Sequence, residues 1–180
     1  MSAGVVVWVT GLPSAGKSTF AEAMLTELRE RNAHACVLDG DAVRASLSPP
    51  LGYSAIDRAH FYETLARLAA LLARQGLVVL VPATAHRRSF RARAGELAPE
   101  FIEVFVDTPR EECERRDSKK LYARSRAGEE HEVPGAAAPY EASTRPAIVA
   151  HGGFDRIAQE ALLAQLLRLG AVSAQAKIPA

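Results

Sequence analysis

Cysteine is scarce in this chain, and neither sign of charge is in clear excess. Cys36 and Cys113 are the only cysteines in 180 residues, and no pattern supports a disulfide between them, so we expect two free thiols. The formal net charge is +1, which gives the chain no general electrostatic reason to bind nucleic acid or an anionic membrane. Local clusters of arginine still suit a protein that handles phosphates.

Long apolar runs and targeting signals are also missing. No run is long enough to span a bilayer, and residues 1–4 lack the basic and apolar regions of a signal peptide. A hydrophobic content of 48% and a charged content of 24% are typical of a soluble globular protein, and the length fits one domain over residues 1–180. We therefore expect a cytoplasmic protein with no membrane partner and no nucleic-acid partner.

Asparagine is nearly absent too. The single asparagine, Asn32, is followed by Ala33, so the Asn-Lys-x-Asp sequence with which GTP switches read guanine does not occur. This absence argues against a guanine-specific switch, but it does not argue against a protein that binds ATP.

The most informative stretch is residues 11–18, whose sequence GLPSAGKS fits the phosphate-binding pattern G-x-x-x-x-G-K-S. It follows a β-branched apolar run and precedes a helical pattern, so motif and context favour a phosphate site over a glycine-rich turn. Glycines let the backbone approach an anion, to which loop N–H groups and the helix N-terminus present positive charge. Lys17 should reach the β- and γ-phosphates of ATP, and the Ser18 hydroxyl should ligate Mg²⁺. The predicted nucleotide-binding residues are Gly11, Ser14, Ala15, Gly16, Lys17, Ser18 and Thr19.

Apolar periodicity predicts alternating strands and helices along the chain. Strands are expected at residues 5–10, 34–38, 77–81, 101–106 and 147–150, and helices at 17–31, 54–75, 109–116 and 154–169. The apolar faces of the 54–75 and 154–169 helices contain Phe61, Leu65, Leu68, Leu71 and Leu72, and Ile157, Leu162, Leu166 and Leu169. The order indicates an α/β fold, with a parallel five-stranded sheet and a loose tail from residue 171.

Polar segments follow three of the predicted strands. Asp39-Gly40-Asp41 comes where ligands bind in open α/β sheets, and beside a phosphate loop we favour a functional role over a helix cap. Residues 84–93 hold His86 and four arginines, which either begin a solvated helix or face the phosphates; both interpretations stay open. The basic residues 115–126 predict a lid over the phosphates rather than a nucleic-acid patch, and residues 129–144 predict an active-site loop.

Together these motifs resemble those of adenylylsulfate kinases, and the resemblance covers nearly the whole chain. Besides the phosphate loop, the matching segments are LDGDAVR at 38–44, LGYSAIDR at 51–58, FIEVFVDTP at 101–109, CERRD at 113–117, KKLY at 119–122, RAG at 126–128 and PYE at 139–141. The resemblance implies a P-loop kinase sandwich with helices on both faces of the sheet, a basic lid and a homodimer. In that family, Mg-ATP phosphorylates the ribose 3′-hydroxyl of adenosine 5′-phosphosulfate (APS), giving 3′-phosphoadenosine 5′-phosphosulfate.

The resemblance also implies roles for individual side chains. Lys17, Asp39 and Asp41 would be catalytic, with Asp39 beside the attacking hydroxyl and Asp41 orienting the site. Ser18 and Asp39 would be the metal ligands, and one arginine among 115, 116, 124 and 126 would stabilise the transferred phosphoryl group. The acceptor-binding residues that it implies are Arg44, Tyr53, Arg58, Phe61, Arg88, Lys119 and Leu121.

Five of these acceptor residues have an expected partner. Arg44 and Arg58 would bind the phosphosulfate, and Tyr53 stands where an aromatic residue stacks on the acceptor adenine. Lys119 and Leu121 would contact the acceptor nucleotide from the lid.

Departures from the family pattern all lie on the acceptor side. Phe61 stands for an asparagine, Glu63 for an arginine, residues 133–135 (VPG) for Phe-Thr-Gly, and residues 84–88 (TAHRR) for Ile-Ser-Pro-Tyr-Arg. Loss of one stacking face would weaken base binding by about tenfold or more. Two alternatives therefore stay open: a kinase of the same scaffold for another nucleotide or small-molecule hydroxyl, and an ATP-binding regulator without turnover.

Overall fold

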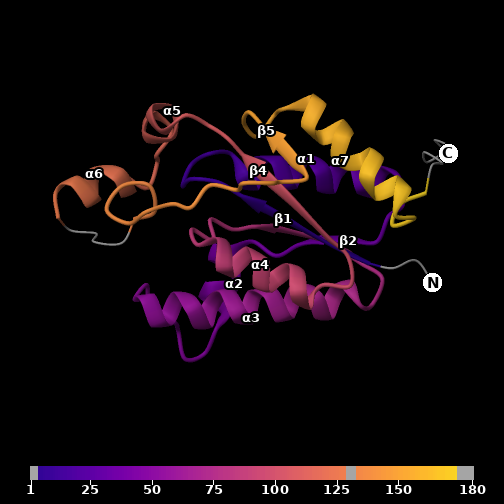
Figure 1. Ribbon diagram of the computed structural model, residues 1–180, viewed down its shortest axis with the longest axis horizontal. Helices are drawn as coiled ribbons and strands as arrows, with labels where there is room; N and C mark the ends of the chain where they lie inside the picture. The colour runs from indigo at the N-terminus through magenta and orange to yellow at the C-terminus, as the bar shows by residue number, and fades with distance from the viewer. Residues whose placement is uncertain (1–3, 129–132, 174–180) are drawn as a thin grey trace.

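The computed structural model describes residues 4–128 and 133–173. Its parallel strands form one sheet in the order β2-β3-β1-β4-β5, with helices on both faces (Figure 1). The strands are β1 (Val5–Thr10), β2 (Ala35–Val37), β3 (Val78–Pro82), β4 (Phe101–Val106) and β5 (Ile148–Ala150). The helices are α1 (Lys17–Glu30), α2 (Gly40–Ser46), α3 (Ala55–Ala73), α4 (Arg88–Leu97), α5 (Arg110–Arg115), α6 (Leu121–Arg126) and α7 (Arg156–Arg168). The predicted α/β class and five-stranded parallel sheet are confirmed.

Strand β1 lies at the centre of the sheet because both of its faces are apolar. All six of its residues are buried. Val5, Val7 and Val9 join the core cluster that includes residues of α1 and α7, whereas Val6 and Trp8 join the cluster that includes residues of α3. Alternate residues of a strand point to opposite faces, so one continuous apolar run supplies both cores.

The predicted elements begin and end close to the observed bounds, with two informative differences, whereas α2, α4 and α6 were not among the predicted helices. Pro82, expected just beyond its strand, is the last residue of β3 and pairs with Val9. The expected loose tail starts too early, because the Ala171 N–H donates to the Leu166 carbonyl at 3.0 Å and Val172 is buried. Residues 174–180 of that tail lie outside the described part.

On helices α3 and α7, some of the large apolar side chains expected to face the core are exposed, and alanines are buried instead. On α3 the buried positions include four alanines, and Leu68 and Leu71 are 36% and 54% exposed. On α7 Ala158 is buried, while Ile157 is 81% and Leu169 is 39% exposed. The prediction that these four large residues belong to core-facing stripes is wrong. Small side chains let a helix lie close to the sheet, so close packing decided the buried face.

The carboxyl ends of the parallel strands share one edge of the sheet. The phosphate loop follows β1, Asp39 follows β2, and residues 83–87 follow β3. Helices α5 and α6 lie beyond this edge, whereas the start of β1 and the end of α7 lie at the opposite end (Figure 1). Ligands of open α/β sheets bind at this edge, so the predicted site residues gather where the fold provides room for them.

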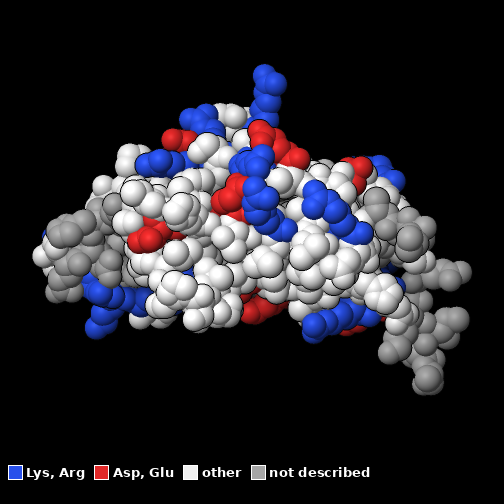
Figure 2. Space-filling model, turned by 90° about the horizontal axis from the view of Figure 1, so that it is seen from below, with Lys and Arg blue, Asp and Glu red and all other residues white. Residues whose placement is uncertain are grey.

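The surface and the thiols agree with the composition. Figure 2 shows the side of the molecule that carries α3, where Lys and Arg side chains are interspersed with Asp and Glu.

Both cysteines are free thiols, as expected, with Cys36 half-buried and Cys113 buried. Among the described helices, none combines the length and the hydropathy that crossing a membrane requires.

Candidate active site

Side chains from the lid and from the β4–α5 connection hold the phosphate loop in one conformation. Thr108 Oγ1 donates to the Ala15 carbonyl at 2.8 Å, and Tyr122 Oη donates to the Pro13 carbonyl at 3.0 Å. Gly16 has φ +102°, and an added Cβ would meet neighbouring backbone at 2.7 Å. This position therefore requires glycine on grounds of both conformation and space. These contacts and the glycine conformation together fix the shape of the loop.

Lys17 begins α1, and its ammonium group lies inside the loop. Nζ donates to the Leu12 carbonyl at 2.8 Å. Burial lowers the pKa of Lys17 to about 8. A desolvated cation whose hydrogen-bond partner is a neutral carbonyl is stabilised by an anion, and a bound phosphate chain would supply one.

Ser18 and Asp39 meet at the mouth of the loop. Ser18 Oγ donates to Asp39 Oδ2 over 3.2 Å. Around an octahedral Mg²⁺ with oxygens at about 2.1 Å, adjacent ligand oxygens are about 3 Å apart, so this pair fits two neighbouring ligands. The described residues contain no group of three His, Cys, Asp or Glu that could hold a metal, but Mg²⁺ beside phosphates needs only one or two protein ligands.

Asp39 has a second role in the fold. Its other carboxylate oxygen, Oδ1, accepts hydrogen bonds from the N–H groups of Asp41 and Ala42, both at 3.0 Å, and so caps α2. The choice between a helix cap and a site residue is therefore not exclusive, because the two oxygens serve the two roles separately.

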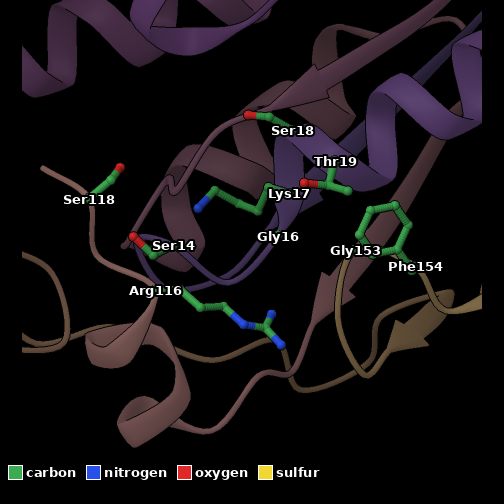
Figure 3. A pocket seen from close by; sticks show the side chains of 9 residues that line it. All are labelled: Ser14, Gly16, Lys17, Ser18, Thr19, Arg116, Ser118, Gly153 and Phe154. Carbon is green, nitrogen blue, oxygen red and sulfur yellow. The ribbon is translucent and has the colours of Figure 1, made fainter.

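A cavity of about 560 Å³ opens in front of the loop (Figure 3). It is lined by Ser14, Gly16, Lys17, Ser18, Thr19, Arg116, Ser118, Gly153 and Phe154. The side chain of Arg116 enters from the lid, and the Phe154 ring, which is 81% exposed, lies across from it (Figure 3). The volume is within the range of small-molecule sites.

Most of the predicted nucleotide-binding residues line the cavity, and so does one of the candidate lid arginines. Gly11 and Ala15 do not line it, and the Ala15 side chain is fully buried. Of the four candidate lid arginines, Arg116 lines the cavity. Arg115, Arg116 and Arg126 all form ion pairs with glutamates of α5, so the ion pairs do not distinguish them. Arg116 is thus the lid arginine best placed to meet a bound nucleotide.

A second cavity, of about 550 Å³, lies between the starts of α3 and α4 and the 137–141 segment. Its lining consists of Ala55, Arg58, His86, Arg87, Phe90, Ala137, Ala138, Pro139 and Glu141. Arg58 is a predicted acceptor residue, but Arg87 takes the place expected for Arg88. The backbone N–H of Arg88 donates to Glu141 Oε2 at 2.7 Å, and its guanidinium lies 3.8 Å from the same carboxylate.

Arg44 lies between the rings of Tyr53 and Phe61, close to this second cavity's Arg58. The Arg44 Cζ is 4.7 Å from the Tyr53 centroid and 3.8 Å from the Phe61 centroid. Tyr53 is 57% exposed and can offer its ring to a ligand. Phe61 is 3% exposed, so it has little surface with which to touch an acceptor. The structure thus places Phe61 beneath Arg44 and does not present it to a ligand.

The lid reaches α2 through an ion pair between two predicted site residues. Lys119 Nζ lies 2.5 Å from Asp41 Oδ2, and this carboxylate raises the pKa of Lys119. Both side chains are mostly exposed, so the pair contributes little to stability. It does show that the lid lies over the start of α2. Leu121 begins α6 and lines neither cavity.

Two departures from the family pattern have structural partners. Glu63 joins α3 to α4 through Arg93 at 3.0 Å and also pairs with Arg67 at 2.7 Å. The Ala138 N–H donates to the Val133 carbonyl at 3.1 Å, and Val133 is 5% exposed within this compact turn. Glu63 therefore serves helix packing, and Val133 is buried rather than open to an acceptor base.

Arg91 organises the wall of the second cavity, and its role was not predicted. The side chain is buried, and Nε donates to Glu103 Oε1 at 2.9 Å. Nη1 and Nη2 donate to the carbonyls of Ala85 and Glu141, both at 2.6 Å. Of the four arginines after β3, this one is neither solvated nor phosphate-facing. The available signal was Glu103, a charge within an apolar strand, which needs a partner.

Comparison with known proteins agrees with this geometry. The model of the adenylylsulphate kinase family matches residues 3–151. An adenylyl-sulfate kinase of a Picosynechococcus strain is 38% identical, covering 94% of this chain and 97% of the relative, and one of Paraburkholderia xenovorans is 41% identical with the same coverage. The solved APS kinase of Mycobacterium tuberculosis, in complex with AMPPNP and APS, is 38% identical with a TM-score of 0.82, covering 94% of this chain and 98% of that one. This chain belongs to the adenylylsulphate kinase family.

Proposed function

We propose that this protein transfers the γ-phosphoryl group of ATP to the 3′-hydroxyl of APS, releasing ADP, 3′-phosphoadenosine 5′-phosphosulfate and a proton. The observation that carries the proposal is the pairing of a preshaped phosphate loop with a second, arginine-bearing cavity at the same sheet edge, in a chain of this family. The reaction needs little covalent chemistry from the protein, so positioning and charge neutralisation are its main tasks.

The donor half binds the phosphates and the base of ATP. The loop N–H groups and Lys17 hold the β- and γ-phosphates. The negative charge of the phosphates stabilises the buried ammonium group of Lys17. Arg116 and Phe154 lie on two sides of the cavity, where a planar base fits between a guanidinium and a ring (Figure 3). Arg116 already lines this cavity, so it would lie beside the donor nucleotide.

Ser18 and Asp39 would hold Mg²⁺ through the two oxygens that face each other. Bound together with ATP, the ion neutralises charge on the β- and γ-phosphates. Asp39 also orients the acceptor hydroxyl and takes up its proton as the oxygen attacks. Asp41, held by Lys119 at the start of α2, orients the lid above them.

The acceptor half binds an anionic nucleotide. Arg44 and Arg58 take the phosphosulfate, because two guanidinium groups, in the last turn of α2 and at the start of α3, match a group that carries more than one negative oxygen. Tyr53 stacks on the adenine with its exposed ring. Lys119 contacts the same nucleotide from the lid.

One experiment separates this function from its two alternatives. Purified protein is incubated with Mg-ATP and, in turn, APS, adenosine 5′-monophosphate and a panel of sugar alcohols, and the nucleotide products are separated. Phosphorylation of APS alone, with a product from which a 3′-nucleotidase removes phosphate, supports the proposal. Preference for another hydroxyl supports a changed acceptor, and slow ATP hydrolysis that no acceptor stimulates supports a regulator. A homodimer in the cytoplasm is the expected state, and light scattering on the purified protein tests the assembly.

A further inference from the structure

Arg44 is a buried cation whose guanidinium group is held in position by two aromatic rings. It is 8% exposed, with its Cζ 3.8 Å from the Phe61 centroid and 4.7 Å from that of Tyr53. Nη1 donates to the Gly52 carbonyl at 2.6 Å and, more weakly, to the Leu51 carbonyl at 3.4 Å. One edge of the guanidinium is thus anchored to backbone, and two rings contact the group.

The opposite edge of the guanidinium lacks a partner. Among the described residues, Nε and Nη2 of Arg44 make no hydrogen bond, and no carboxylate forms an ion pair with Arg44. These two nitrogens are not sealed inside the protein. Burial lowers the pKa of Arg44, which shows that the charge is poorly solvated there. Parallel N–H groups on Nε and Nη2 are the donors with which arginine binds phosphate- or sulfate-like oxygens in pairs.

Phe61 belongs to a row of packed rings that makes this arrangement rigid. Its ring contacts Tyr62 edge to face at 5.3 Å, and Tyr62 in turn stacks on Phe90 at 4.7 Å. The Ala85 N–H donates to Tyr62 Oη at 3.0 Å, which fixes the middle ring. An amide at position 61 would hold Arg44 by accepting one of its N–H groups. The Phe61 ring holds the plane of the guanidinium and consumes no donor.

We propose that Phe61 is a positioning residue that acts through Arg44, fixing its guanidinium so that Nε and Nη2 together face the anionic group of the acceptor. Phe61 does not touch the acceptor itself, in agreement with its 3% exposure. The inference rests on the proposed function, because it assigns Arg44 to the acceptor's phosphosulfate.

The test compares Phe61→Met with the wild-type enzyme. Methionine nearly preserves the side-chain volume and removes the ring. We expect the KM for APS to rise by about three- to thirtyfold, the range of a desolvated cation–π contact, while the KM for ATP and the kcat at saturating APS stay within about twofold. The control is Phe101→Met, which removes a ring from the same apolar cluster at the start of β4 and should leave all three constants unchanged. An unchanged KM for APS in Phe61→Met overturns the inference.

A double-mutant cycle distinguishes positioning from general loosening of the core. Arg44→Met should raise the KM for APS further than Phe61→Met does, and adding Phe61→Met to Arg44→Met should then change nothing more. If the KM for APS of the double variant rose by the product of the two single effects, Phe61 would act independently of Arg44, and the inference would be overturned. Thermal melts of every variant verify folding.

Binding of inorganic sulfate separates a failure of this inference from a failure of the proposed function. A wild-type enzyme that does not phosphorylate APS refutes the function, and sulfate titration followed by NMR of Arg44 then decides the role of Phe61. Weaker sulfate binding in Phe61→Met supports positioning, and equal binding overturns it.

Discussion

Replacement of Asp39 by asparagine should remove most turnover and leave folding almost intact, because the two carboxylate oxygens have separate roles. Oδ1 accepts from the N–H groups of Asp41 and Ala42 at 3.0 Å and caps α2, and an asparagine oxygen caps equally well. We expect the free energy of unfolding of Asp39→Asn to fall by no more than about 0.5 kcal/mol. Asp39→Ala loses the cap, so its free energy of unfolding should fall by about 1 kcal/mol, and its melting temperature should fall by about 2–4 °C.

Turnover should respond differently from stability. Oδ2 faces Ser18 at 3.2 Å, and under the proposed function it would bind Mg²⁺ and take up the proton of the hydroxyl. A neutral amide does neither, so kcat should fall by about a hundredfold or more in both variants. Saturation with Mg²⁺ should also require a higher concentration of the ion.

The assay measures ADP release at saturating ATP and APS over a Mg²⁺ titration, with thermal melts of the same samples. Asp155 provides the matched control, because it caps α7 by accepting from the Ala158 N–H at 3.0 Å. Asp155→Asn and Asp155→Ala should reproduce the stability pattern without the loss of turnover. Near-normal kcat in Asp39→Asn would refute the catalytic role, and equal destabilisation by Asn and Ala would refute the capping role.

Three further predictions test the donor site and the buried arginine. Lys17→Ala should lower kcat by about a thousandfold or more while circular dichroism shows a folded protein, because the charge on the transferred group loses its partner; near-normal activity would disprove the donor site. Phe154→Ala should raise the KM for ATP by about tenfold and leave the KM for APS unchanged, as expected for loss of base stacking; an effect on APS alone would move Phe154 to the other site. Arg91→Met should lower the free energy of unfolding by about 3 kcal/mol in denaturant titrations, because Glu103 and two carbonyls lose buried donors; a change within error would show that water replaces the guanidinium.

The sequence predicted best those features that neighbouring residues decide. The phosphate loop is a local motif, and Lys17 and Ser18 lie where its spacing places them. Strand β1 could be assigned from six consecutive apolar or β-branched residues because a central parallel strand is buried on both faces. The same locality explains why a helix cap and a site role could both be considered for Asp39, for which the structure shows the cap.

Features that depend on residues far apart along the chain could not be predicted from the sequence. The role of Arg91 depends on Glu103 and on two carbonyls that approach only in the folded chain. The stacking of Phe61 on Arg44 joins residues from two helices, so the replacement of an asparagine looked like a loss when only the sequence was known. The exposure of Leu68 follows from alanines that bring α3 close to the sheet, which a hydrophobic pattern alone does not encode.

The most direct test of the central claim is the conversion of ATP to ADP with and without micromolar APS, followed by identification of the second product. The account predicts strong stimulation by APS and a product phosphorylated on the 3′-hydroxyl. ATP that binds tightly but is not consumed faster when APS is added would contradict the assigned acceptor, even though the donor site would stand.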